Sequence, residues 1–269
     1  MNKTIDPEST ITSISRFLVE KLDRSGLSGY VIGLSGGIDS ALSATLAVKA
    51  VGVAKVYGVL MPYKTSSPES RKDASEVAEW LGIDHRVVDI SPMIDAYYPE
   101  ITDTMRIRAG NKMARERMSI LFDVAHGMKR MVLGTGNRTE IALGYTTWYG
   151  DAACSLNPVG QLYKTDVRML AKHLDLPQAV QQKKPSADLW VGQTDEGEIG
   201  VTYDEIDRLL VRILDDGERS KSVLEKEGFN GNNIDRVITL INGNAFKRNT
   251  PAIAQLGKNP VPDSVQLDA

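Results

Sequence analysis

Near its N-terminus the chain reads Tyr30-Val31-Ile32-Gly33-Leu34-Ser35-Gly36-Gly37-Ile38-Asp39-Ser40-Ala41. The apolar first part predicts a buried strand, and the residues from Asp39 onward predict a helix. Between the two, the glycines let the backbone approach an anion closely and point amide hydrogens at it, while the helix N-terminus adds the positive end of its dipole. The stretch therefore predicts a phosphate-binding loop.

The polar side chains of this loop indicate which class of phosphate-binding loop it belongs to. Ser35 and Ser40 offer hydroxyl donors, whereas Asp39 repels a phosphate unless a cation such as magnesium lies between them. No lysine follows the glycines, which excludes a Walker A loop. Ser-Gly-Gly-Ile-Asp-Ser resembles the pyrophosphate loop of the N-type ATP pyrophosphatases, which cleave ATP to AMP and pyrophosphate while activating a carboxylate or carbonyl oxygen. The alternative is a glycine-rich turn that serves only tight packing.

Composition bounds the class of protein. A chain of 269 residues that is 42% hydrophobic and 25% charged can bury one substantial core, and we expect residues 1–269 to form a single domain. The net charge of −3 disfavours extended nucleic-acid binding. The single cysteine, Cys154, excludes an internal disulfide and a thiolate-rich zinc site. The polar N-terminus and the absence of a long apolar run predict a cytoplasmic protein with no membrane partner.

Apolar runs and helical patterns alternate along the first half of the chain. We expect strands at 30–34, 55–62, 85–90 and 130–134, and helices at 11–22, 39–51, 68–81 and 105–128. Nearly all-apolar strands separated by helices predict an α/β fold with a doubly wound, mainly parallel sheet and helices on both faces. Ligands of such sheets bind beyond the carboxyl ends of the strands, so the loops after Leu34, Pro62, Ile90 and Gly134 should surround the site.

The C-terminal third is expected to complete the same domain with helices at 203–214 and 234–246. Residues 183–200 are polar, rich in glycine and poor in strand signals. They are interpreted either as an active-site loop or as a disordered surface excursion.

A second glycine turn, Leu133-Gly134-Thr135-Gly136-Asn137-Arg138-Thr139-Glu140, follows the fourth expected strand. By position it faces the same crevice as the first loop. Thr135 is a candidate hydrogen-bond partner for adenine or ribose. Asp39 and Glu140 are candidate magnesium ligands, because hard cations prefer oxygen ligands and usually take one or two carboxylates plus phosphate. Alternatively, Glu140 is a capping or first-turn acid of the next helix.

Further segments extend the resemblance to one family. They are Asn111-Lys112-Met113-Ala114-Arg115-Glu116-Arg117-Met118, Tyr149-Gly150-Asp151, Leu162-Tyr163-Lys164-Thr165, Lys184-Pro185-Ser186-Ala187-Asp188-Leu189 and Phe246-Lys247-Arg248. Together with the two glycine turns, they resemble ammonia-dependent NAD synthetase in that family's order and cover most of the chain. The resemblance implies an adenine nucleotide alpha-hydrolase-like fold and a homodimer. It also implies adenylation of the nicotinate carboxylate of deamido-NAD by ATP, followed by displacement of AMP by ammonia.

The resemblance also implies roles for individual residues. ATP would be bound by Gly33, Leu34, Ser35, Gly36, Gly37, Ile38, Asp39, Ser40, Thr135, Lys164 and Ser186. Magnesium would be held by Asp39 and Glu140, and deamido-NAD would be contacted by Arg115, Trp148, Ser155, Phe246 and Lys247. A simple surface lysine remains the alternative for Lys164. Asp151 is grouped with Asp39 and Glu140 as catalytic. It either orients ammonium or accepts its proton, or else it fixes the Tyr149-Gly150 turn.

Three positions depart from the family pattern, and all belong to the part that resembles the deamido-NAD site. Trp148 stands where a lysine is common, Ser155 where an aspartate is, and Phe246 where a histidine is. Stacking on Trp148 is expected to replace a charge contact. Arg108, Lys112 and Arg115 share one face of the long helix and form either a cationic wall of the crevice or a solvated stripe.

Two other functions remain open at this point. One is the ATP-pyrophosphatase subunit of GMP synthetase, which would amidate a xanthine nucleotide. The other is a non-enzymatic module that binds adenine nucleotides. Two carboxylates on the phosphate side disfavour the module, because binding alone does not need them. Cys154 lies in the loop region of Tyr149-Gly150-Asp151, where a packing role is expected, so glutamine hydrolysis by a cysteine nucleophile is not expected.

Overall fold

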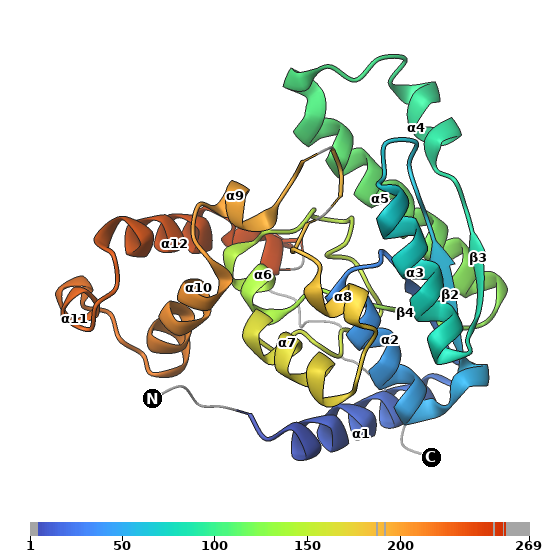
Figure 1. Cartoon of the computed structure of the whole chain (residues 1–269), viewed down its shortest axis with the longest axis horizontal. Helices are drawn as coiled ribbons and strands as arrows, with labels where there is room; N and C mark the ends of the chain where they lie inside the picture. The colour runs from blue at the N-terminus through green and yellow to red at the C-terminus, as the bar shows by residue number, and fades with distance from the viewer. Residues whose placement is uncertain (1–4, 187, 191, 250, 255, 257–269) are drawn as a thin grey trace.

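The computed structural model describes residues 5–186, 188–190, 192–249, 251–254 and 256 (Figure 1). Its strands are β1 (Tyr30–Gly33), β2 (Val56–Leu60), β3 (Asp84–Val87) and β4 (Met131–Leu133). Its α-helices are α1 (Pro7–Ser25), α2 (Ile38–Val51), α3 (Pro68–Leu81), α4 (Ser91–Tyr97), α5 (Arg106–Gly127), α6 (Arg138–Leu143), α7 (Lys164–His173), α8 (Gln178–Gln182), α9 (Asp195–Ile199), α10 (Tyr203–Leu210), α11 (Lys221–Lys226) and α12 (Gly231–Gly243). Short 3-10 turns at Val53–Lys55, Asp103–Met105 and Ala245–Arg248 and a π-helical turn at Val211–Asp215 connect them.

The sheet of the described residues is parallel, with the strand order β3-β2-β1-β4. Tyr30 of β1 pairs with Val56 on one side and with Met131 on the other. The chain therefore leaves β1 in one direction towards β2 and β3, and β4 returns to the opposite side of β1. Crevices form at such a reversal of strand order, and here the reversal lies between the ends of β1 and β4. The predicted α/β class and parallel sheet are confirmed.

Alternate residues of β1 point to opposite faces of the sheet, as a strand requires. Tyr30 and Ile32 pack into a core with α1, α2, α3 and α7, whereas Val31 packs into a second core with α4 and α5. All three side chains are fully buried, which explains why β1 appears in the sequence as an unbroken apolar run. Helices on both faces of the sheet are visible in Figure 1.

Helix α3 has the bounds that its end signals predict. Ser67 is the N-cap and accepts a hydrogen bond from the Ser70 amide at 3.0 Å, and Pro68 occupies the first turn. Gly82 ends the helix at φ 67°, a left-handed conformation that glycine adopts without penalty. Strand β3 begins and ends earlier than the predicted 85–90 because most of its residues are exposed, so it lacks the apolar pattern of a central strand.

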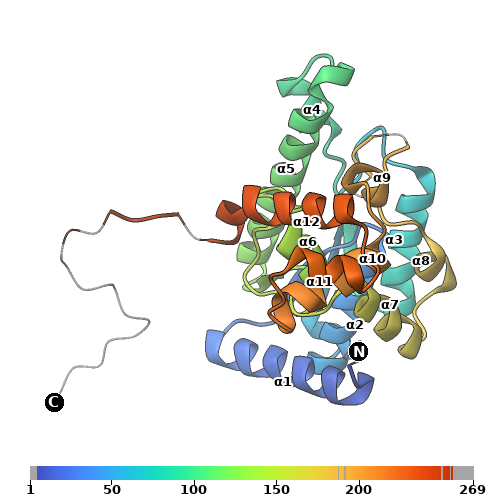
Figure 2. The same cartoon turned by 90° about the vertical axis from the view of Figure 1, so that its left-hand side faces the viewer.

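Helices α6, α10 and α12 surround a third core that includes Leu143, Tyr203, Leu210 and Val237. This helical layer lies beside the sheet rather than on it, as the two views show (Figures 1 and 2). The expected helix at 203–214 ends as α10 at Leu210 and continues as the π-helical turn. In the part of the chain that the structure describes, no helix is both long and apolar enough to cross a membrane.

Candidate functional site

A crevice of about 1090 Å³ opens at the carboxyl ends of the strands. The loops after β1, β2 and β4 line it, together with one face of α5, described residues between Lys183 and Ile199, and residues of α12. Residues 183–186, 188–190 and 193 are irregular and contribute to its wall, which agrees with an active-site loop, although α9 follows within the range expected to lack regular structure.

The loop after β1 is held by its own hydroxyl groups. The Ser35 and Ser40 hydroxyl oxygens lie 3.1 Å apart, and Ser40 also donates to the Gly37 carbonyl at 3.0 Å. Gly36 has φ +75°, and a Cβ there would lie 2.4 Å from the Ser70 carbonyl oxygen of α3. Only glycine fits this position, because both the conformation and the close approach exclude a side chain. The loop is therefore seated on α3 and opens onto the N-terminus of α2.

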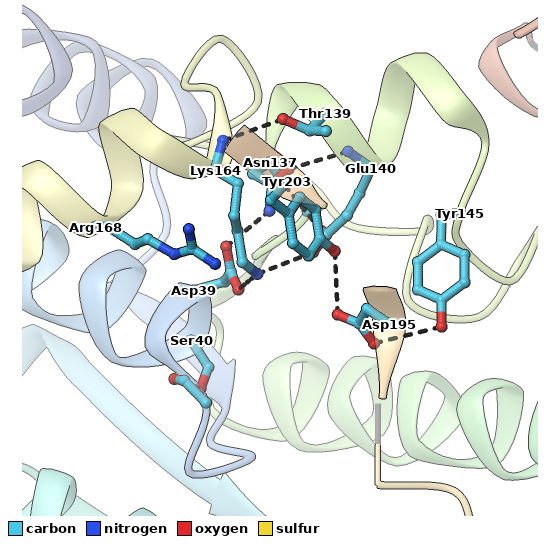
Figure 3. Close-up of polar contacts among 12 residues, drawn as sticks. Asp39, Ser40, Asn137, Thr139, Glu140, Tyr145, Lys164, Arg168, Asp195 and Tyr203 are labelled. Atoms are coloured by element: carbon cyan, nitrogen blue, oxygen red, sulfur yellow. Dashed lines mark hydrogen bonds and ion pairs between the residues drawn. The ribbon is translucent and has the colours of Figure 1, made fainter. Parts of the chain in front are cut away.

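Lys164 is the central cation of the site (Figure 3). Its side chain is 2% exposed, and Nζ lies 2.6 Å from the Asp39 carboxylate and 3.4 Å from the Glu140 carboxylate. Burial on its own lowers the pKa of Lys164, but the charges of Asp39 and Glu140 outweigh it and raise that pKa. Burial also raises the pKa of Glu140, and the charge of Lys164 opposes this shift. The surface-lysine alternative for Lys164 is thus wrong.

Helix ends fix these three charged groups. Asn137 caps α6 by accepting from the Glu140 amide at 3.0 Å, while the Glu140 side chain accepts from the Asn137 amide at 3.1 Å. The Asn137 side chain also donates to Asp39 at 2.9 Å and so links α6 to α2. Glu140 is therefore both a capping acid and a wall of the crevice, so its two interpretations are compatible. Lys164 is the first residue of α7, directly after the Tyr163 N-cap.

A buried carboxylate behind the site joins α6 to α7. Asp207 of α10 is 3% exposed, accepts from the Thr139 hydroxyl, and accepts from the Thr165 amide at 2.8 Å. The Thr139 oxygen accepts in turn from the Lys164 amide at 3.1 Å. Asp207 thereby fixes the separation of the two helix N-termini that carry Glu140 and Lys164.

An aromatic and acidic wall completes this side of the crevice. The Lys164 ammonium lies 4.9 Å from the centre of the Tyr203 ring, within the range of a cation–π contact. Tyr203 donates its hydroxyl to Asp195 at 3.0 Å, and Tyr145 donates to the other Asp195 oxygen at 3.3 Å. Burial raises the pKa of Asp195, while Lys164 and the two tyrosines lower it. Figure 3 shows these groups gathered around the lysine.

The structure brings together nearly all residues predicted for ATP. Those that line the crevice are Gly33, Leu34, Ser35, Gly37, Ile38, Asp39, Ser40, Thr135, Lys164 and Ser186. Gly36 lies behind them against α3. Glu140 and Asp151 also line the crevice, and Asp151 accepts from the Thr146 hydroxyl at 2.5 Å and from the Thr147 amide at 2.8 Å. Asp151 thus holds its turn in place while its carboxylate borders the cavity. Ala187, within the motif that contains Ser186, lies outside the described residues.

The residues predicted for deamido-NAD are arranged differently. Lys247 lines the crevice and donates to the carbonyls of Gly144 and Thr146 at 2.8 and 2.9 Å. Ser155 does not line it, because its hydroxyl accepts from the Val132 amide at 3.1 Å beside β4. Arg115 is exposed and donates to the Trp148 carbonyl at 3.1 Å.

Trp148, Tyr149 and Phe246 form an aromatic rim outside the cavity wall. The Trp148 ring stacks on Tyr149 with centroids 4.5 Å apart and meets the edge of Phe246 at 5.2 Å. Tyr149 and Phe246 are each half exposed. The rim therefore presents aromatic surface to solvent beside the crevice.

The predicted cationic stripe of α5 is solvated. Arg108 and Arg115 are exposed, and Lys112 pairs with Glu116. The face that lines the crevice instead carries Ile107, Asn111, Ala114, Arg117, Met118 and Leu121. Sequence reasoning missed Arg117, as well as Asn137, Asp195, Tyr203 and Asp207. Only Asn137 carried a local signal, because asparagine three residues before glutamate is a capping-box pattern.

A family profile, related sequences and solved structures all show similarity to the same group of proteins. The profile of a family described as NAD synthase matches residues 10–251. An NH(3)-dependent NAD(+) synthetase of Fusobacterium nucleatum is 46% identical over 257 residues, which are 95% of this chain and 99% of that protein. A structure of an NMN synthetase from Francisella tularensis superposes with a TM-score of 0.82 at 34% identity, covering 94% of this chain and all of that one. An NH3-dependent NAD synthetase from Campylobacter jejuni, in complex with nitrate, gives 0.79 at 32% identity with the same coverage.

Proposed function

We propose that this chain, which belongs to the NAD synthase family, amidates deamido-NAD with ammonia and ATP to give NAD, AMP and pyrophosphate. It is an ATP-dependent ligase of that family. The observation that carries the proposal is the buried Lys164 between Asp39 and Glu140, beside a loop shaped for phosphate at the reversal point of the sheet. An adenylation site needs this combination of phosphate donors and fixed charges.

The reaction has two displacements, and the residues act mainly by binding and orientation. In the first, a nicotinate carboxylate oxygen attacks the α-phosphorus of ATP, the bond to the β-phosphate oxygen breaks, and pyrophosphate leaves. The amides after Gly36, with the Ser35 and Ser40 hydroxyls, would hold the phosphates, and Lys164 would neutralise the charge that develops on them. In the second, ammonia attacks the activated carbonyl carbon and AMP leaves with the carboxylate oxygen. We assign Asp151, which borders the cavity, to orient ammonium and accept its proton.

Magnesium fits the site as a further component. Asp39 and Glu140 both direct carboxylate oxygens at the Lys164 ammonium, at 2.6 and 3.4 Å, so two oxygen ligands of the kind that magnesium prefers border the crevice. Among the described residues, no group of three or more acidic, histidine or cysteine side chains could hold a metal alone. Magnesium at nucleotide sites needs only one or two carboxylates, with substrate phosphates and water as the other ligands. We propose that Asp39 and Glu140 hold it, and its chemistry there would be neutralisation of phosphate charge.

We further propose that residues 1–269 act as one catalytic domain within a homodimer in the cytoplasm, where the nucleotide substrates are found. The exposed aromatic rim supports the dimer proposal, because half-exposed aromatic side chains beside a binding site are typical of interfaces. Trp148, Phe246, Arg115 and Lys247 would then contact deamido-NAD at or across that interface. The Ser155 hydroxyl accepts a hydrogen bond from the Val132 amide, so Ser155 would contribute there only by holding the backbone of β4 in place.

Substrate comparison tests the proposal. The purified chain is incubated with ATP, magnesium and ammonium, and with deamido-NAD, xanthosine monophosphate or no acceptor. We expect NAD, AMP and pyrophosphate in equal amounts from deamido-NAD and none from the other two. Amidation of the xanthine nucleotide would instead indicate a GMP synthetase subunit. Absence of pyrophosphate with every acceptor would indicate a binding module.

One observation favours a second acceptor, the deamidated mononucleotide. The similar structure from Francisella tularensis is described as an NMN synthetase, and most residues predicted for the dinucleotide lie outside the crevice of this chain. A ratio of kcat/KM that favours deamido-NAD over the mononucleotide supports the main proposal, and the reverse ratio favours the second acceptor.

A further inference from the structure

Arg117 is a cation of the crevice to which no role has been assigned above. It lies on α5 three residues after Ala114 and four before Leu121, so the three share one helix face, and all of them line the cavity. Some of its surface is exposed, although protein surrounds most of the side chain. The guanidinium group thus borders the space where the substrates would bind.

The hydrogen bonding of Arg117 leaves most of its donors available. Nε donates to the Met61 carbonyl at 2.9 Å, at the end of β2, which fixes the plane of the group. Within the described ranges, Arg117 has no carboxylate at ion-pair distance, and its two terminal nitrogens have no hydrogen-bond partner. Three other half-buried or buried cations of the crevice are engaged: Lys164 with Asp39, Lys183 with Asp73 and Lys247 with two carbonyls.

An enclosed guanidinium without a paired carboxylate is costly to maintain, because removing a charge from water is repaid only by a close counter-charge. Burial lowers the pKa of Arg117 to about 10, against the opposing charges of Asp188 and Asp151, which lie too far away to form ion pairs. The group remains charged at neutral pH. Charged groups kept in this state inside a cavity are concentrated at functional sites, where a ligand supplies the missing partner.

We propose that Arg117 is a catalytic residue whose terminal nitrogens bind a pair of anionic oxygens on a substrate in the crevice. The inference rests on the proposed function, which places two such groups there: the α-phosphate of ATP and the carboxylate that attacks it. Both present two oxygens to a planar fork of N–H donors, a geometry that arginine matches and lysine does not. Arg117 would approach them from the α5 side of the crevice.

Three variants test the assignment. Arg117→Ala removes the cation, Arg117→Lys keeps the charge without the fork, and Arg106→Ala is a matched control on the same helix, where an exposed arginine pairs with Asp103. We expect Arg117→Ala to lower kcat/KM by roughly a hundredfold to a thousandfold, Arg117→Lys to recover only part of it, and the control to match wild type. Melting temperatures verify that all three fold.

Chemical rescue separates substrate contact from structural support. Added guanidinium chloride at non-denaturing concentration should restore part of the activity of Arg117→Ala and none in Arg117→Lys, whose side chain still fills the space. A residue that only supports Met61 gives no rescue. Loss of activity without rescue, in a variant that melts like wild type, would overturn the proposal, as would activity equal to wild type in Arg117→Ala.

Binding measurements identify the anion and do not depend on turnover. Calorimetry with a non-hydrolysable ATP analogue and, separately, with deamido-NAD is run on wild type and Arg117→Ala. Weaker binding of the analogue identifies the phosphate, and weaker binding of deamido-NAD identifies the carboxylate. Unchanged binding of both, with kcat reduced and rescued, supports a contact made only in the transition state. If wild type binds both ligands but makes no NAD, the proposed function fails while these affinities still decide the role of Arg117.

Discussion

The phosphate side of the crevice and its aromatic rim are built in different ways. On the phosphate side, Asp39, Glu140 and Lys164 lie at the N-termini of α2, α6 and α7. The Lys164 ammonium contacts both carboxylates directly. At the rim, Trp148 and Phe246 come from segments about a hundred residues apart and meet only through their rings. Helix N-termini thus position the charged groups, whereas the arrangement of the rim depends on how its aromatic side chains pack against one another.

The two regions should therefore respond to mutation with different signatures. Changes on the phosphate side should reduce turnover, because charge stabilisation acts on the reacting groups. Changes at the rim should weaken binding of one substrate, because stacking contributes to affinity.

The largest effect is expected at the charged centre. Asp39→Asn and Glu140→Gln should each lower kcat by roughly a hundredfold to a thousandfold, since a neutral amide is a poor magnesium ligand and no longer balances Lys164. Steady-state rates and melting temperature are measured together. Rates equal to wild type in either variant would contradict the assignment of these carboxylates.

A smaller effect is expected at Asp207, behind the charged centre. Asp207→Asn should lower the free energy of unfolding by about 1–3 kcal/mol, because a neutral group replaces a charged acceptor of buried hydrogen bonds. Turnover should fall as well, since α6 and α7 lose their common anchor. Urea unfolding and kcat are the measurements.

Asp204→Asn is the control for Asp207, because Asp204 lies on the same helix but is exposed and pairs with the partly exposed Arg168 at 3.2 Å. We expect it to change stability by less than about 1 kcal/mol. Equal effects of the two variants would mean that Asp207 does not position the site.

The rim is expected to show the binding signature. Trp148→Ala should raise KM for deamido-NAD by roughly fivefold to 150-fold, which corresponds to about 1–3 kcal/mol of lost stacking, and leave KM for ATP unchanged. Trp80→Ala, at an exposed tryptophan of α3, is the control. If KM for deamido-NAD also stays unchanged in Trp148→Ala, the rim packs against protein rather than against substrate.

The smallest effect is expected at Cys154. Burial raises the pKa of its thiol, and its sulphur lies so close to Gly134 that a Cβ there would be 2.6 Å away. Such a thiol is a poor nucleophile, so Cys154→Ser should keep the ammonium-dependent rate. The purified chain should use ammonium and almost no glutamine. Efficient use of glutamine that disappears in Cys154→Ser would contradict this.

Much of the fold follows from local sequence signals. Strands β1 and β2 are apolar runs because both of their faces are buried, and α3 begins at a proline and ends at a glycine. Helix α7 was missed because its first residues, Lys164 and Thr165, follow a segment rich in glycine and proline that favours a turn. The spacing of Val167, Leu170 and Ala171, which are buried on one face of α7, is the sequence signal that indicates this helix.

The phosphate side of the site was predictable for the same reason. Asp39 and Glu140 each follow a glycine turn at the end of an expected strand, and the carboxyl ends of neighbouring parallel strands lie at the same edge of a sheet, so the two carboxylates could be placed together. Arg115 and Arg117 show the limit of this reasoning: two residues apart on a helix, they point about 200° apart, and only packing decides which one lines the crevice. Asp207 and Tyr203 reach the site from a separate helical layer, and nothing local in the sequence indicates that contact.

The central claim is that the carboxylate of deamido-NAD is activated as an adenylate in this crevice. Its most direct test starts from deamido-NAD labelled with ¹⁸O in the nicotinate carboxylate, incubated with ATP, magnesium and ammonium, and analyses the products by mass spectrometry. If the carboxylate oxygen attacks the α-phosphorus, AMP must carry one labelled oxygen, NAD must keep the other as its amide oxygen, and pyrophosphate must carry none. Unlabelled AMP, or label in pyrophosphate or inorganic phosphate, would contradict the account.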